Sequence, residues 1–162
     1  MISKKIQDAF NEQIQAEMFS SYLYLSMAAY FHSINMDGMA KWMHVQTKEE
    51  NSHAMKFFQH IVDRGGKVEL LQIDKPKTEW NSPLEAFSEA YEHEKYITGR
   101  INNLVKLAAE ESDNAASIFL QWFVTEQVEE EANTCKITEM LKKIGDSANG
   151  LFMLDSQLGK RE

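Results

Sequence analysis

The sequence is poor in cysteine, proline and glycine. Its single cysteine, Cys135, cannot form a disulfide within the chain, and it excludes a metal site built from several thiolates. The two prolines, Pro76 and Pro83, lie in one short region. Six of the seven glycines fall where a helix would end or a turn would form. Long segments of helix-forming residues therefore lie between these breakers.

Long apolar runs are also missing. No stretch approaches the roughly 20 apolar residues that a membrane-spanning helix requires, and the N-terminus, MISKKIQDAFNEQ, lacks the apolar segment and cleavage site of a secretory signal. We therefore expect a cytoplasmic protein that does not bind membranes. The net charge of −8 disfavours nucleic acid as a partner and suits cations.

The remaining pattern predicts an all-α protein with four long helices and a short fifth one, over about 4–34, 38–64, 83–111, 114–143 and 149–158. The first two long helices are joined by a short connection, as are the last two, so each pair forms an antiparallel hairpin. The connection between the hairpins, GGKVELLQIDKPKTEWNSP, is long enough to run the length of a bundle. Four such helices with one long crossover define a ferritin-like four-helix bundle. We expect residues 1–162 to form a single domain of this kind.

Each long helix carries a glutamate in the middle of its apolar face. Residues seven positions apart on a helix point in nearly the same direction, and this spacing places four glutamates among large apolar side chains: Glu17, Glu50, Glu94 and Glu130. Burying one ionised carboxylate without a partner is costly, and four together also repel one another. No lysine or arginine lies at the central levels of these faces. Either the carboxyl groups are protonated, or the predicted helix phases are wrong, or cations lie between them.

The residue types favour the cations. Glu50 and His53 are three positions apart, so their side chains reach one point from the same helix. A carboxylate from each of two helices, with a Glu-x-x-His motif from each of the other two, is a recurring di-iron arrangement in bundle cores. The second helix carries that motif intact, whereas the fourth carries the variant Gln127-x-x-Glu130. Mostly oxygen ligands with one imidazole suit iron, manganese or, less well, zinc, and four carboxylates balance two divalent ions.

Three further glutamates point to one side of the bundle centre. They could form an additional cation site on the route out of it: Glu49, Glu126 and Glu129. The alternative is a solvated acidic surface, which we prefer for Glu131. Off the core face of the first helix, Tyr22, Leu23 and Tyr30 are expected to contact another subunit.

These stretches resemble one known family. The segments NEQIQAEMFSSYLYLSM, KEENSHAMKFF, YEHEKYI and FLQWFVTEQVEEEA, followed by LFMLDSQLG, resemble bacterial non-haem ferritins over about residues 5–158. The ligand pattern and the short fifth helix agree together, which makes the resemblance specific. Bacterioferritin has a histidine where this chain has Glu130, and a haem-binding methionine where it has Asn51. The resemblance therefore implies a protein without haem.

The resemblance also implies roles for the central residues. Glu17, Glu50 and His53 would hold a first iron ion. Glu50 would bridge to a second iron ion held by Glu94 and Glu130.

Three more features follow from the same resemblance. Gln127 would lie beside the second iron, as a weak ligand or an orienter of bound dioxygen or water. Tyr24 would lie next to the first site, where it would hydrogen-bond a ligand and could donate an electron; the alternative is an ordinary core aromatic. A possible third iron site would comprise four glutamates: Glu49, Glu126, Glu129 and Glu130.

The function implied is iron storage and detoxification. A ferroxidase would oxidise Fe(II) to Fe(III) with dioxygen or peroxide, and a homo-oligomeric shell of 24 copies would store the ferric mineral. Two other functions remain open on the residues alone. One is a non-storage di-iron or di-manganese oxidase or peroxidase, and the other is a structural helical assembly without metal.

Overall fold

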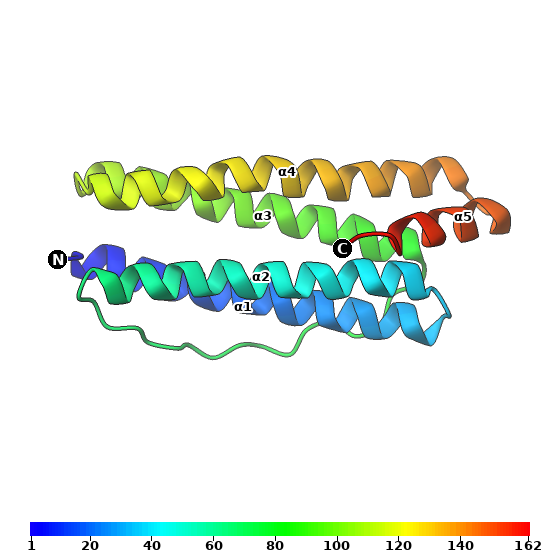
Figure 1. The fold of residues 1–162 in the computed structure, drawn as a ribbon, viewed down its shortest axis with the longest axis horizontal. Coiled ribbons are helices and arrows are strands. Elements are labelled where there is room, and N and C mark those ends of the chain that lie inside the picture. The colour runs from blue at the N-terminus through cyan, green and yellow to red at the C-terminus, as the bar shows by residue number, and fades with distance from the viewer.

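The computed structural model describes residues 1–162, which form five α-helices and no strand. The helices are α1 (Lys4–Ser33), α2 (Asp37–Asp63), α3 (Pro83–Glu110), α4 (Asn114–Ile144) and α5 (Ala148–Leu158). Their limits lie within one residue of the predicted ones. Figure 1 shows α1 to α4 side by side in an elongated bundle, with α5 at one end. The predicted fold class, a four-helix bundle with one long crossover and a short fifth helix, is confirmed.

The crossover, residues 64–82, runs along the outside of the bundle beside α1 (Figure 1). Side chains of α1 hold its backbone in place. The Asn11 amide donates to the carbonyl of Lys67 over 3.1 Å, and the Ser26 hydroxyl donates to the carbonyl of Lys77 over 2.6 Å. Because the crossover spans the bundle, α2 and α3 run in the same direction, and all four helices can present their midpoints at one level.

Local signals at the helix ends explain where the elements start and stop. The Ser82 hydroxyl accepts a hydrogen bond from the Glu85 N–H over 3.1 Å, and Pro83 occupies the first helical turn of α3. Gly65 ends α2 with a φ of 69°, a left-handed conformation that glycine adopts without strain. These stops fix the lengths of the helices, and so fix which residues reach the middle of the bundle.

The apolar core is divided into two parts. One cluster lies around Phe31, Met43 and Phe87 at the end of the bundle that carries α5, and the other lies around Phe10, Phe57 and Phe123 at the opposite end. Between them, the buried side chains are mainly polar. The four glutamates of the sequence analysis belong to this polar layer, so the structure holds them between two apolar ends.

Two surface expectations are resolved by the structure. Leu23 is only 4% exposed and packs in the core, so the expectation that it faces another subunit was wrong. Tyr22 is 50% exposed, whereas Tyr30 packs against Trp80 of the crossover at a ring distance of 5.4 Å.

Leu154 and Leu158 of α5 are buried against the chain's own bundle. None of the helices combines the length and the apolar character that crossing a membrane requires.

Candidate metal centre

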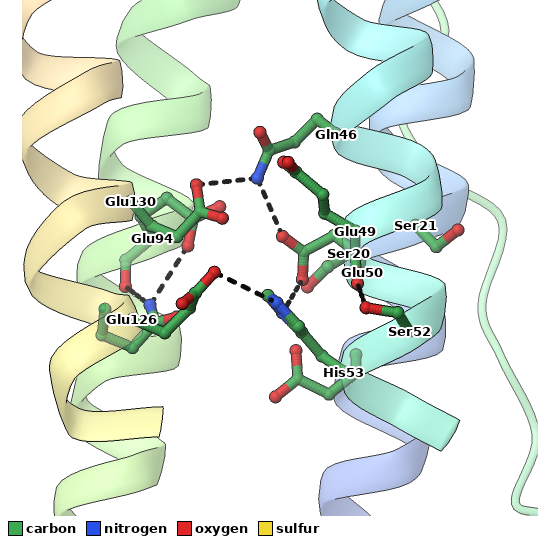
Figure 2. A network of polar contacts seen from close by, with 12 residues as sticks. Ser20, Ser21, Gln46, Glu49, Glu50, Ser52, His53, Glu94, Glu126 and Glu130 are labelled. Carbon is green, nitrogen blue, oxygen red and sulfur yellow. Dashed lines mark hydrogen bonds and ion pairs between the residues drawn. The ribbon is translucent and has the colours of Figure 1, made fainter. Parts of the chain in front are cut away.

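The four central glutamates come from the four long helices and meet near the middle of the bundle. Figure 2 shows Glu50, Glu94 and Glu130 at this level, and Glu17 lies close to Glu50 and His53. Each is at most 3% exposed, and His53 is 2% exposed. The structure therefore brings together the residues predicted to face inward. Their burial follows from helix geometry, because the residues one or two turns away on the same face of each helix are large and apolar.

Three groups of three side chains have ligand atoms close enough to hold an ion, and two of them contain only central residues. In the first, oxygen or nitrogen atoms of Glu17, Glu50 and His53 lie within 4.8 Å of one another. In the second, oxygen atoms of Glu50, Glu94 and Glu130 do the same. Glu50 belongs to both groups, so it is placed where one carboxylate can contact two neighbouring ions. Its Oε2 atom lies 3.5 Å from His53 Nδ1.

The outer glutamates behave differently from one another. Glu126 approaches the centre, with Oε1 at 3.6 Å from His53 Nε2, and it forms a third close group with His53 and Glu130. Glu49 turns to the guanidinium of Arg161 (Figure 2 shows Glu49 beside Gln46). Glu129 is exposed and belongs to none of the close groups. Of the three outer glutamates, the structure therefore brings only Glu126 into a close group with the centre.

Burial and mutual repulsion make ionisation of the central carboxyl groups unfavourable. Burial is the main cause of each shift, and nearby carboxylates add to it. The pKa of Glu17 is raised to about 8, with Glu50 as its strongest charged neighbour. The pKa of Glu130 is raised to about 8 and that of Glu94 to about 7, while the pKa of Glu50 lies well above its usual value. A layer of this kind favours protons or metal ions over free negative charge.

One oxygen atom of the layer has no partner. Glu17 Oε2 is buried and makes no hydrogen bond, although buried polar atoms are almost always paired. No lysine or arginine reaches any of the four central carboxylates. An unpaired oxygen, a single imidazole and four carboxylates form a donor set that fits two divalent cations of the iron or manganese type.

Tyr24 and Gln127 both contact Glu94. The Tyr24 hydroxyl donates a hydrogen bond to Glu94 Oε1, and the pKa of Tyr24 is raised by burial and by the Glu94 carboxylate. The Gln127 amide donates to Glu94 Oε2 over 3.1 Å. Gln127 thus lies beside the second group, as the resemblance implies. Tyr24, in contrast, is bonded to a member of the second group rather than of the first.

Sequence reasoning gave no role to two buried glutamines. Gln13 and Gln46 are fully buried, and each lies one helical turn before a central glutamate. Gln13 Nε2 donates to Glu17 Oε1 over 2.8 Å, and Gln46 Nε2 donates to Glu50 Oε1 over 3.0 Å. The signal was present in the sequence, because a glutamine four positions before a glutamate shares its helix face.

The fold and this layer define a class: a ferritin-like bundle with a candidate di-metal centre inside one subunit. A family model described as a ferritin-like domain matches residues 7–144, and the chain belongs to this ferritin family.

Relatives and solved structures agree with this assignment. A bacterial non-haem ferritin of Bacteroides fragilis is 47% identical over 161 residues, which covers 99% of this chain and 100% of the relative. A bacterial non-haem ferritin of Staphylococcus aureus is 37% identical, covering 99% and 97% of the two chains. The crystal structure of an open-pore ferritin from the archaeon Archaeoglobus fulgidus superposes with a TM-score of 0.99 at 50% identity, with both chains fully covered.

Proposed function

We propose that the protein stores iron and detoxifies it. It oxidises Fe(II) to Fe(III) at the central glutamate layer and keeps the ferric product as a mineral inside a hollow shell of identical chains. One observation carries the proposal: four buried glutamates, one from each long helix, converge without a lysine or arginine partner. The relatives named non-haem ferritin support the same function. Residues 1–162 act as one ferritin-like domain.

The proposed iron ligands follow the two close groups. Glu17, Glu50 and His53 bind one Fe(II) ion, and Glu94 and Glu130 bind the second, with Glu50 bridging the two. The unpaired Glu17 Oε2 supplies a free lone pair for the first ion. Gln127 and Tyr24 are both hydrogen-bonded to Glu94, and through these bonds they orient this ligand of the second ion. The proposal includes no haem, since the chain has Asn51 where bacterioferritin has its haem-binding methionine.

The chemistry depends on exchanging protons for metal ions. Fe(II) binding displaces protons from carboxyl groups that are protonated near neutral pH, since the pKa values of Glu17 and Glu130 are about 8. Each Fe(II) ion gives one electron to dioxygen or peroxide, which is the oxidant. Carboxylates bind the harder Fe(III) ion more strongly than Fe(II), and this difference favours oxidation.

The product then needs a place to go. Glu49, Glu126 and Glu129, together with Glu130, form the proposed third iron site on the route from the pair to the interior. A single bundle has no room for a mineral, so the storage form is a homo-oligomer, which we propose to be a 24-copy shell in the cytoplasm. The ferritin structures that superpose on this chain support that assembly. Neither nucleic acid nor a membrane is a partner.

Aerobic loading with excess Fe(II) tests the proposal. We expect iron-cored particles in electron micrographs, and fast formation of Fe(III) in stopped-flow absorbance. Glu50→Ala removes the bridge and should abolish the fast phase, whereas Glu92→Ala removes an exposed carboxylate of α3 and should leave it unchanged. Wild-type oxidation rates in Glu50→Ala would refute the assignment of the centre. Fast oxidation by the wild-type chain without retained iron would instead indicate a non-storage di-iron oxidase.

A further inference from the structure

Gln46 is fully hydrogen-bonded on its nitrogen side. Its amide nitrogen has two hydrogen atoms, and both are used: Nε2 lies 3.0 Å from Glu50 Oε1 and 2.8 Å from Glu130 Oε2. Figure 2 shows this amide spanning the two carboxylates, which come from α2 and α4. One glutamine therefore fixes the distance and orientation of two proposed iron ligands.

The oxygen side of Gln46 is held by Arg161, the penultimate residue of the chain. Arg161 Nη1 donates to Gln46 Oε1 over 2.9 Å, and Nη2 donates to Glu49. The guanidinium also stacks over the Trp42 ring, at 4.5 Å from its centre. Arg161 is thus anchored from three directions: its contact with Gln46 leads to the central carboxylates, and its contact with Glu49 leads to a glutamate of the proposed third iron site.

A similar arrangement occurs on the side of the layer that α1 and α3 form. Gln13 is fully buried, and its Nε2 donates to Glu17 Oε1 over 2.8 Å. Its Oε1 accepts a hydrogen bond from Arg100 Nε over 2.9 Å. Arg100 is held in turn by Tyr96, whose hydroxyl lies 3.3 Å from Nη1. Two arginines from different parts of the chain therefore contact the centre through one glutamine each.

The arginines decide which end of each amide faces the carboxylates. A primary amide can turn by 180° with little change in shape, which exchanges its oxygen and nitrogen ends. A guanidinium has only hydrogen-bond donors, so it can bond to the amide oxygen but not to the amide nitrogen. With the oxygen fixed, the N–H groups must point at Glu17, or at Glu50 and Glu130. In the reversed orientation the amide oxygen would face these side chains, and it could accept a hydrogen bond only from a protonated carboxyl group, not from an ionised carboxylate.

We infer that Arg100 and Arg161 are positioning residues of the metal centre: through Gln13 and Gln46 they hold three of the four carboxylates in place before a divalent cation enters. This inference rests on the proposed function of the centre. It assigns the C-terminal tail a part in preparing a site that lies in the middle of the bundle. Neither arginine touches the cation, and neither takes part in electron transfer.

Arg→Lys substitutions test the inference without changing net charge. Lysine keeps the positive charge but lacks the planar fork that bonds Gln46 and Glu49 together, or Gln13 and Tyr96 together. The control is Arg64→Lys, because Arg64 bonds Asp113 at a remote end of the bundle, with Nη1 at 2.9 and 2.8 Å from the two carboxylate oxygens. Melting curves of all variants verify that they fold.

The probe is Co²⁺, added under anaerobic conditions to the metal-free full-length protein. The visible absorption of bound Co²⁺ reports both affinity and coordination, and the signal lost in Glu50→Ala defines the part that belongs to the centre. We expect Arg100→Lys and Arg161→Lys each to bind Co²⁺ about tenfold more weakly, with an altered spectrum, because losing a group that holds metal ligands in place typically weakens affinity by about tenfold or more. Arg64→Lys should match the wild type within about twofold.

Each arginine is judged by its own variant. A variant that binds Co²⁺ with the affinity and spectrum of the Arg64→Lys control refutes the positioning role of that arginine. If this holds for both variants while the wild-type chain binds Co²⁺ and oxidises Fe(II), the inference fails and the proposed function stands. If the wild-type chain binds no Co²⁺ at the centre, the proposed function and the inference fail together.

Discussion

Replacing Glu17 by glutamine should stabilise the metal-free protein at alkaline pH. Glu17 is buried, and its Oε2 atom has no hydrogen-bond partner. When its carboxyl group is ionised and no cation is present, the folded chain holds a negative charge that solvent cannot stabilise. Glutamine has nearly the same shape as the protonated acid and cannot ionise, so Glu17→Gln removes this cost.

The pH range and the magnitude follow from the raised pKa. In the unfolded chain the carboxyl group titrates near 4.5, and in the folded chain near 8. The stability that Glu17 contributes is therefore fully present below pH 4.5 and is lost as the pH rises to about 8. Between pH 5.5 and pH 8 the loss is about 3 kcal/mol, at about 1.4 kcal/mol per pH unit. For a chain of this length, that corresponds to a change in melting temperature of about 6–12 °C.

The assay is differential scanning calorimetry of chelator-treated protein at pH 5.5 and pH 9. We expect Glu17→Gln to raise the melting temperature relative to the wild type by about 6–12 °C more at pH 9 than at pH 5.5. The exposed substitution Glu92→Gln serves as the control and should show no such difference. An equal effect of Glu17→Gln at both pH values would show that Glu17 does not titrate in this range, and would refute the electrostatic reasoning.

Three further substitutions test other parts of the structure. Tyr24→Phe removes the hydroxyl that donates to Glu94, and should weaken anaerobic Co²⁺ binding about tenfold; unchanged affinity would contradict that role. Leu154→Ala empties a buried position of α5 and should cost about 2–4 kcal/mol, seen as a lower melting temperature, whereas Phe152→Ala, at an exposed position, should change little. Ser82→Ala removes the cap of α3 and should cost about 1 kcal/mol by the same assay, so an unchanged melting temperature would argue against the cap.

Much of the fold could be predicted because its signals are local. Helix ends are set by nearby residues, as Ser82 and Gly65 illustrate, and the number and length of helices then select the bundle. The central glutamates were found because a charged residue on an apolar face conflicts with its surroundings. Seven-residue spacing gives the direction of a side chain well enough to detect this conflict within one helix.

The remaining features depend on contacts that helix periodicity does not describe. Arg161 reaches Gln46 only because the last residues fold back along α2, and Arg100 meets Gln13 across two helices. Leu23 was assigned to the surface because it lies away from the main apolar stripe, yet a bundle helix with two neighbours buries a wider face. Glu129 was expected near Glu126, but the structure leaves it exposed.

The division of the apolar core has a consequence for how ions can pass. The two apolar clusters hold the helices together on both sides of the glutamate layer. The spacing of the helices therefore does not depend on whether protons or metal ions occupy that layer. We therefore expect divalent cations to enter and leave the layer by rotation of a few side chains, while the helices keep their positions. Repeated loading and removal of cations would then not require the chain to unfold.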